Sequence, residues 1–365
     1  MKIVADPNIP FVREAFAALG QVELVPGRSV APERIRDATA LLVRSVTPVH
    51  AGLLTGSCVR FVATATIGTD HVDEVYLATR GIGFASAAGS NANSVAEYIV
   101  AALLELAHRH KFRLRDKTLG VVGVGNVGSR VVRYAEVLGL RVLQNDPPRQ
   151  QAENFPDFVT LEQALTQADI VTVHVPLLET TRHMFHHDNL EKFILLNTAR
   201  GAVVDNRALL KAIDGDRIPA AALDVWENEP TISPELLDVV DIGTPHIAGH
   251  SFDGKVTGTR LIYEAACKHF GFAPTWQPVL PPPVVPQIEL SVSSGEDDEE
   301  VLYRVVKRVY DITVDDAALR KNVPAFDKLR TDYPVRREFF NTELVLHGAR
   351  DDLRAKCASL GFKIG

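Results

Sequence analysis

The N-terminal part of the chain alternates short apolar runs with segments of mixed polarity. Within 10–19, the side chains of Phe11, Ala15, Phe16 and Leu19 share one face of a helix. Strands that alternate with helices are typical of a parallel sheet with crossover helices. The strands predicted here are Lys2–Ala5, Val22–Val25, Ala40–Val43, Arg60–Ala65 and Gly83–Ser86.

A long apolar stretch, Asn93–His108, then predicts a buried helix that leads into a second α/β unit. After that unit, a helix over about 254–270 returns the chain to the first one. We therefore expect two parallel-sheet domains: a discontinuous, flavodoxin-like substrate domain (1–92 and 249–280) and a Rossmann domain (93–248). The strands predicted for the Rossmann domain lie near 119–124, 141–145, 170–175, 193–197, 220–225 and 240–243.

The last part of the chain, 281–365, follows a proline-rich linker at Leu280–Pro286. Its pattern predicts two strands and two helices, with little apolar content for an independent core. We expect a small α+β domain that completes its core against a partner subunit and forms a homodimer. The predicted elements are Gln287–Val292, Glu299–Tyr310, Glu343–His347 and Asp351–Leu360.

Three glycines at the start of the second unit, Gly123, Gly125 and Gly128, lie between a predicted strand and a helix. Two of them let the backbone approach a pyrophosphate, and the third lets the helix pack closely on the strand. The helix N-terminus favours an anion there. Asp146, about 20 residues further on, can hold the ribose hydroxyls of NAD, and its charge disfavours the 2′-phosphate of NADP. Arg149 lies nearby, and its positive charge leaves NADP slightly open as the cofactor.

Composition excludes several other classes of protein. The chain has 365 residues, a formal net charge of -7 and three widely spaced cysteines without a CxxC pair. These properties argue against a nucleic-acid surface and a cysteine-built metal site. No apolar run approaches the roughly 20 residues that cross a bilayer, and no signal peptide precedes the first strand. We expect a cytoplasmic protein. His183, His186 and His187 lack an acidic pattern, so we expect no metal site.

Three polar residues follow buried strands of the second unit: Arg200, Glu229 and His246. The carboxyl edge of an open α/β sheet is where ligands bind. A guanidinium there can hold a carboxylate or polarise a keto oxygen. An imidazole beside a carboxylate can take a proton from a hydroxyl group. Together with a dinucleotide site, this set indicates a dehydrogenase.

The motifs around these residues resemble the D-isomer-specific 2-hydroxyacid dehydrogenases. The resemblance rests on the glycine turn, Asn197–Gly201, Leu223–Pro230 and Thr244–Gly249. It implies that Arg200, Glu229 and His246 are catalytic and that Ser45 and Thr66 contact the substrate. Arg44, at a strand end beside Ser45, is a candidate for binding the substrate's carboxylate or phosphate, and His250 is a further candidate substrate contact. The resemblance also implies NAD contacts at Gly123, Gly125, Asn126, Val127, Gly128, Asp146, Val175, Thr198, Ala199, Arg200, Asp224 and Gly249.

A closer resemblance, over almost the whole length, is to a branch of this family that acts on a phosphorylated 2-hydroxy acid. It rests on Leu42–Thr47, Thr64–Asp73, Gly243–Gly249 and Asp332–Phe339. It implies NAD-dependent oxidation of 4-phospho-D-erythronate during pyridoxal 5′-phosphate biosynthesis. Val175 and His250 depart from the usual Thr and Tyr of the relatives. Arg336 and Arg337 fit an oligomer contact, or a cation lent to a neighbouring active site.

Two alternatives stay open. One is a sibling dehydrogenase that acts on 3-phosphoglycerate and has a regulatory C-terminal domain. The other is an NAD-sensing protein that uses this fold as a dimerisation switch, for which loss of a catalytic group would be diagnostic.

Overall fold

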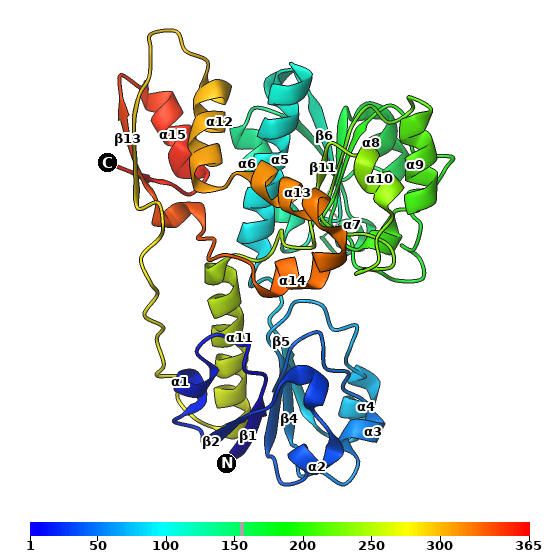
Figure 1. Ribbon diagram of the computed structural model, residues 1–365, viewed down its shortest axis with the longest axis vertical. Helices are drawn as coiled ribbons and strands as arrows, with labels where there is room; N and C mark the ends of the chain where they lie inside the picture. Colours follow the sequence, from blue (N-terminus) through cyan, green and yellow to red (C-terminus); the bar gives the residue numbers. More distant parts are fainter. Residues whose placement is uncertain (154–156) are drawn as a thin grey trace. The chain divides into compact units, whose positions relative to one another are not determined.

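The computed structural model describes residues 1–153 and 157–365 (Figure 1). The chain forms two compact units. The first comprises Met1–Asn91 and Ser251–Pro282, and the second comprises Ala92–His250 and Pro283–Gly365. The finer division into three domains stays a prediction.

The first unit is built on a five-stranded parallel sheet in the order β2-β1-β3-β4-β5. This is the flavodoxin-like strand order expected from the sequence. Ile3 and Ala5 belong to one apolar core and Val4 to another, because successive side chains of a strand point to opposite faces. The strands are β1 (Lys2–Ala5), β2 (Gln21–Leu24), β3 (Ala40–Val43), β4 (Phe61–Thr64) and β5 (Gly83–Ser86).

Helices cover both faces of this sheet. α11 (Phe252–Phe270) and α1 (Val12–Phe16) pack on one face, where Tyr263 and Phe16 meet edge to face. The predicted helix over 10–19 is shorter because it begins only after Phe11, whose backbone is left-handed. The remaining helices are α2 (Pro32–Ile35), α3 (Ala51–Leu54) and α4 (Glu74–Thr79).

The second unit contains a six-stranded parallel sheet in the order β11-β10-β9-β8-β6-β7. A single bridge from Gln144 to Phe158 extends it beyond β7. With that bridge counted, the order reverses beside β6 as in a Rossmann fold. The strands are β6 (Thr118–Val122), β7 (Arg141–Asn145), β8 (Ile170–Val173), β9 (Ile194–Asn197), β10 (Ala221–Leu223) and β11 (Ile242–Gly243).

Helix α5 (Ala92–His110) is the predicted buried helix, and it packs against α6 (Gly128–Val137) on one side of the sheet (Figure 1). Its residues from Val95 to Ala107 are all buried. The other helices of the Rossmann part are α7 (Pro147–Glu153), α8 (Leu161–Gln167), α9 (Asn206–Asp214) and α10 (Pro234–Val239). Short 3-10 helices span Gly27–Ser29, Leu114–Asp116, Gly201–Val203, Val323–Ala325 and Phe339–Asn341.

The C-terminal residues form a third sheet of three parallel strands, an α/β arrangement where the sequence indicated α+β. Its apolar residues, including Ile288, Leu290 and Val305, join the same core as helices α5 and α6. The prediction that this core is completed by a partner subunit was therefore wrong, because the chain's own Rossmann part completes it. The elements are β12 (Gln287–Ser291), α12 (Asp298–Val309), α13 (Ile312–Lys321), α14 (Phe326–Thr331), β13 (Glu343–His347), α15 (Asp351–Ser359) and β14 (Lys363–Ile364).

Helices α13 and α14 were not predicted, because their sequence alternates charged and apolar residues without a strong periodic pattern. Their first residues, Ile312 and Phe326, are buried, and α13 packs against β11 and α5. Within the described residues, no helix is both long enough and apolar enough to span a membrane.

Candidate active site

The three predicted catalytic residues follow neighbouring strands of the Rossmann sheet. Arg200 follows β9, Glu229 lies in the loop after β10, and His246 follows β11. Strands β9, β10 and β11 are adjacent and parallel, so their carboxyl ends meet at one edge. The sheet therefore brings together side chains that are far apart in the sequence.

The loops after β9 and β10 pack unusually closely at Gly201. A Cβ atom added there would lie 2.0 Å from the backbone carbon of Trp226. Any other residue at Gly201 would push the Arg200 turn away from the loop that carries Glu229. The side chain of Asn197 also closes this turn, since its Nδ2 donates to the Arg200 carbonyl at 3.1 Å. Sequence reasoning missed both roles, although Gly201 stands in the Asn197–Gly201 motif.

His246 and Glu229 form a hydrogen-bonded pair, with 2.7 Å between Nδ1 and Oε2. An ionised carboxylate can only accept, so Nδ1 carries the proton and Nε2 is left as a proton acceptor. Burial raises the pKa of the Glu229 carboxyl, but the hydrogen bond from His246 and other favourable contacts outweigh it. The net pKa lies below its ordinary value, which keeps Glu229 ionised at neutral pH.

Glu229 is itself held by the backbone, because the amide of Trp226 donates to its Oε1 at 2.9 Å. The indole Nε1 of Trp226 donates in turn to the carbonyl of Thr244 at 2.9 Å. Trp226 thus connects the loop that carries Glu229 to the loop that carries His246. Nothing in the sequence pattern had singled out this tryptophan.

A cavity of about 250 Å³ opens beside these residues. Arg200, Glu229 and His246 line it together, as does a second cation, Arg182, which sequence reasoning had not selected. The size suits a small organic acid. The cavity is also lined by Leu177, Gly201, Ala202, Trp226, Glu227 and Asn228.

The carboxylate of Asp224 lies under the His246 loop and is 1% exposed. Its Oδ1 accepts from the amide of Ile247 at 2.7 Å, and its Oδ2 accepts from the amide of Ala248 at 3.0 Å. Burial raises the pKa of this carboxyl. The carboxylate therefore holds the loop in place, while the predicted contact of Asp224 with NAD stays a prediction.

The glycine turn has the space that a dinucleotide requires. Gly123 has a φ of 89°, and a Cβ atom there would lie 2.8 Å from the backbone of His174. At Gly128 a Cβ atom would lie 2.0 Å from the carbonyl oxygen of Gly123, so helix α6 can start only with glycine. Gly125 faces open space. The turn thus leaves an accessible backbone at the N-terminus of a helix, which fits a pyrophosphate.

The predicted ribose ligand, Asp146, lies at the end of β7 and touches this turn. Its Oδ2 accepts from the amide of Val124 at 2.8 Å, and its Oδ1 accepts from the amide of Arg149 at 3.0 Å. The guanidinium of Arg149 pairs with Glu153 through both Nε and Nη2. Because Glu153 offsets its charge, Arg149 is poorly suited to a 2′-phosphate, and this supports NAD over NADP.

The remaining predicted cofactor contacts lie at or beyond the carboxyl ends of strands of the same sheet. Asn126 is exposed and Val127 precedes helix α6, while Val175 packs against Gly123. The Oγ1 of Thr198 lies 3.3 Å from Nδ1 of His174, whose Nε2 lies 2.9 Å from Oγ1 of Thr172. Burial lowers the pKa of His174 to about 3, so the ring is neutral and links two strand ends. Ala199 lies in the loop after β9, and Gly249 lies in the loop after β11.

The predicted substrate contacts Arg44, Ser45 and Thr66 belong to the first unit, at the carboxyl ends of β3 and β4. The Oγ1 of Thr64 lies 2.6 Å from Oγ1 of Thr66 and 3.1 Å from Nε2 of His71. His71 therefore supports this turn. The contacts of Arg44, Ser45 and Thr66 with substrate stay predictions.

His250, at the end of the second unit, packs edge to face on Tyr333, with 5.8 Å between the ring centroids. Arg336 and Arg337 are each 7% exposed within their own chain. The prediction that the segment 332–339 forms an oligomer contact, or lends a cation to a neighbouring active site, stays a prediction. Their side chains are covered by the chain that carries them.

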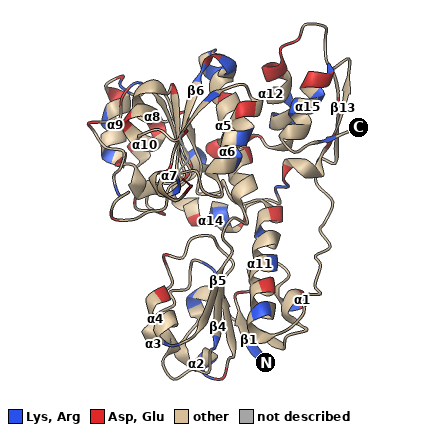
Figure 2. Ribbon diagram, turned by 180° about the vertical axis from the view of Figure 1, so that it is seen from behind, with Lys and Arg blue, Asp and Glu red and all other residues tan. Residues whose placement is uncertain are grey.

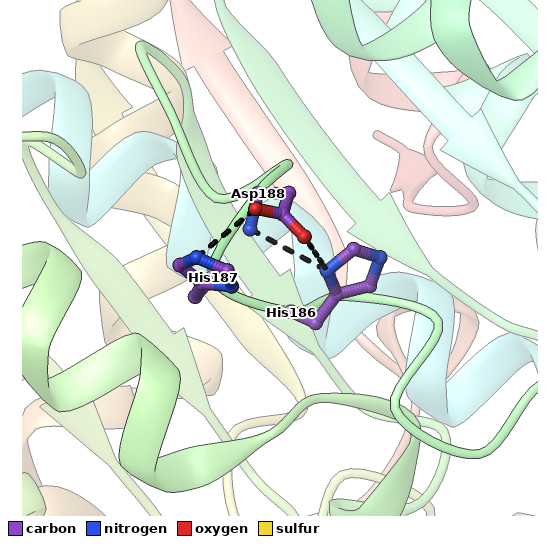
Figure 3. A group of neighbouring side chains, drawn as sticks. All are labelled: His186, His187 and Asp188. Atoms are coloured by element: carbon purple, nitrogen blue, oxygen red, sulfur yellow. Dashed lines mark hydrogen bonds and ion pairs between the residues drawn. The ribbon is translucent and has the colours of Figure 1, made fainter.

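His186, His187 and Asp188 lie close enough for a metal ion, on an exposed loop (Figure 3). Both rings face the Asp188 carboxylate, at 3.4 Å from His186 and 3.0 Å from His187. These are consecutive surface residues that pair with one another, and we assign no metal to them. Figure 2 shows Lys and Arg interspersed with Asp and Glu over the helices of both units, as on an ordinary solvated surface.

Comparison with protein families places residues 90–248 in the NAD-binding domain of the D-isomer specific 2-hydroxyacid dehydrogenases. Residues 279–361 match a domain of unknown function. Erythronate-4-phosphate dehydrogenase of Escherichia coli is 45% identical over 100% of this chain and 98% of its own length. The enzyme of that name from Cronobacter sakazakii is 47% identical over 93% of this chain and 92% of its own length.

Solved structures resemble about three quarters of the chain. D-lactate dehydrogenase from Aquifex aeolicus, complexed with NAD and lactic acid, is 25% identical with a TM-score of 0.62. It covers 74% of this chain, and the match spans 96% of that protein. An NAD-bound 3-phosphoglycerate dehydrogenase from Entamoeba histolytica has a TM-score of 0.64 at 23% identity. The match covers 74% of this chain and 95% of that protein, and it shows a similar fold.

Proposed function

The chain belongs to the erythronate-4-phosphate dehydrogenases of the D-isomer-specific 2-hydroxyacid dehydrogenase family, and on this premise we propose that it oxidises 4-phospho-D-erythronate at C2. NAD is its cofactor. The product is 3-hydroxy-2-oxo-4-phosphooxybutanoate, an intermediate of pyridoxal 5′-phosphate biosynthesis. The observation that carries the proposal is the His246–Glu229 pair, which lines one cavity together with Arg200.

The second unit supplies the groups that would hold NAD. The open backbone at Gly125 and the start of helix α6 would receive the pyrophosphate, and Asp146 would hold the adenosine ribose. Bound NAD accepts a hydride and so supplies the redox chemistry of the reaction. Thr198, Ala199 and Gly249 lie in the loops that would border the nicotinamide.

The chain's own residues supply positioning and proton transfer. The Nε2 of His246 would take the proton of the C2 hydroxyl as the C2 hydrogen leaves with its electron pair. Glu229 keeps the ring in the required tautomer and stabilises the imidazolium that forms. Arg200 would hold the substrate carboxylate and the developing C2 carbonyl through a two-pronged contact.

A direct test is to incubate the purified protein with NAD and 4-phospho-D-erythronate and to follow the near-ultraviolet absorbance of reduced nicotinamide. We expect turnover with a higher kcat/KM than for 3-phosphoglycerate under the same conditions. A preference for 3-phosphoglycerate would favour the sibling activity. No turnover of either acid, with NAD still bound, would favour the sensing alternative.

We also propose that the protein is a homodimer through residues 281–365. This segment exposes large apolar side chains, with Val314 64% exposed and Val335 51% exposed. Helix α5, the other surface considered for an interface, is buried within the chain from Ser94 to Ala107, which favours 281–365. A twofold interface would cover the same patch on both subunits.

Sedimentation of the full chain tests the dimer. We expect Val314→Glu and Val335→Glu, combined, to shift the protein towards monomer, because like charges would face each other across the twofold axis. Val75→Glu is the matched control, since Val75 is 76% exposed on the first unit. A double variant that sediments like the control and the unmodified protein would place the interface elsewhere.

A further inference from the structure

The C-terminal segment 311–339 makes hydrogen bonds to both ends of the loop that carries His246 in the same chain. The amide of Gly243 donates to Oδ1 of Asp316 at 2.7 Å. At the other end of the loop, Nη2 of Arg336 donates to the carbonyl of Ala248 at 2.6 Å. These residues belong to the part of the chain that matches a domain of unknown function.

Arg336 is buried, yet its guanidinium makes few of the hydrogen bonds that it could donate. Its Nη2 also donates to the carbonyl of Ser94 at 3.2 Å, and its guanidinium lies 4.4 Å from the ring centroid of Tyr310. Among the described residues, Nε and Nη1 have no hydrogen-bond partner. Burying a charge with two unused donors is a poor way to stabilise a fold. The contacts of Nη2 with these two carbonyls therefore indicate a role other than stabilising the fold.

Both carbonyls lie beside points where the chain passes between its two units. Ser94 is in the first turn of α5, close to the boundary at Asn91 and Ala92. Ala248 lies close to the boundary at His250 and Ser251. Arg336 thus holds the two connecting segments together on the side of the second unit.

His246 needs such support because its backbone is left-handed, with a φ of 56°. A residue other than glycine in this conformation costs about 1–3 kcal/mol and persists only where its surroundings enforce it. Asp224 fixes the amides of Ile247 and Ala248 from one side of the loop. Arg336 fixes the carbonyl of Ala248.

We propose that Arg336 is a positioning residue for the catalytic histidine, acting within its own chain through the carbonyl of Ala248. The C-terminal segment is then part of the active-site framework of the subunit that carries it, whether or not it also forms the dimer. This inference rests on the proposed function for His246. Its test includes a readout that does not depend on substrate.

The experiment compares full-length Arg336→Met, Arg336→Lys and Arg354→Met. Arg354 is the matched control, because it lies in the C-terminal part of the chain, is half-buried and donates from Nη2 to the carbonyl of Leu346, outside the His246 loop. We expect Arg336→Met to lower kcat by about 10- to 100-fold, since a misplaced catalytic group costs on this scale. Arg336→Lys should lose less, because an ammonium can still reach one carbonyl. Arg354→Met should lower Tm and keep kcat within about twofold at 25 °C.

The second readout is the low-field proton resonance of the hydrogen bond between His246 and Glu229, identified by its absence from His246→Asn. We expect it to be lost or broadened in Arg336→Met and retained in Arg354→Met. If the wild-type protein turns over no hydroxy acid, the proposed activity fails, but this resonance still reports on Arg336. A folded Arg336→Met with normal kcat and resonance would overturn the inference, as would equal losses in Arg354→Met. Should Arg336→Met not fold, unchanged kcat and resonance in Arg336→Lys would overturn it.

Discussion

Two turns at the same edge of the Rossmann sheet both contain a residue with a positive φ, but the residue types differ. The turn after β6 takes a positive φ at Gly123, and the loop after β11 takes a positive φ at His246. Glycine adopts this conformation without cost, whereas a residue with a side chain is strained. The first turn carries no reactive side chain, but the second must present an imidazole.

The difference explains how far each turn depends on distant residues. The conformation of Gly123 is available to the backbone itself, and its close neighbours are His174 and Val175 of the adjacent strand end. The His246 loop is held by Asp224, by Glu229 and by Arg336, which lies in the C-terminal segment between α14 and β13. A strained reactive residue requires more supporting contacts than a glycine.

The largest expected effect is on His246. His246→Asn should lower kcat by about 10²–10⁴-fold, the range of general acid–base catalysis, while NAD still binds. Asparagine tolerates a positive φ, so the loop should keep its conformation. Steady-state kinetics and NAD titration by fluorescence measure the two effects. A variant with near wild-type turnover would exclude His246 as the base.

Two glycine variants separate backbone strain from ligand space. Gly123→Ala should lower both stability and NAD affinity, because its Cβ would lie 2.8 Å from backbone atoms at a φ of 89°. Gly125→Ala should weaken NAD binding by about 10-fold, or about 1.4 kcal/mol. It should leave Tm unchanged, since no atom of the protein lies within 4 Å of the new Cβ. Thermal melts and NAD titrations that gave both variants the same pattern would contradict this separation.

The strain at His246 can be measured without activity. His246→Gly should be more stable than His246→Ala by about 1 kcal/mol, because only glycine is relaxed at this φ. Urea unfolding of both variants gives the difference. Ala358→Gly, in helix α15, is the control and should show the opposite order, with glycine less stable by up to about 1 kcal/mol. Equal stabilities at position 246 would show that the loop is not strained.

A further expected effect is on the pH dependence of stability through His174, beside the glycine turn. The unfolded chain binds a proton on this ring below its ordinary pKa of 6.5, whereas the folded protein does so only near a pKa of about 3. Stability should therefore fall as pH drops below 6.5, by up to about 1.4 kcal/mol per pH unit from this group. His174→Gln should flatten that dependence. Parallel stability curves for both proteins between pH 6.5 and pH 5 would refute a buried neutral ring.

Much of the fold could be predicted from the sequence because it rests on local patterns. Strands β1, β3, β5, β7 and β13 have the predicted bounds, since short apolar runs between polar segments mark them. The glycine turn was also predictable, because glycines at that spacing have a local steric reason. The three candidate catalytic residues were found from their motifs, and the sheet order places them at one edge.

The sequence by itself determined the strand pattern, the glycine turn and the types of reactive side chain. Only the tertiary structure decided what holds those side chains in place. Gly201 is required because Trp226 approaches it, and the C-terminal core is completed by α5 and α6 of the same chain. Arg336 reaches Ala248 across 88 positions of sequence. Local periodicity reports on hydrogen bonds and sterics within a few residues, whereas these contacts exist only once separate elements have packed.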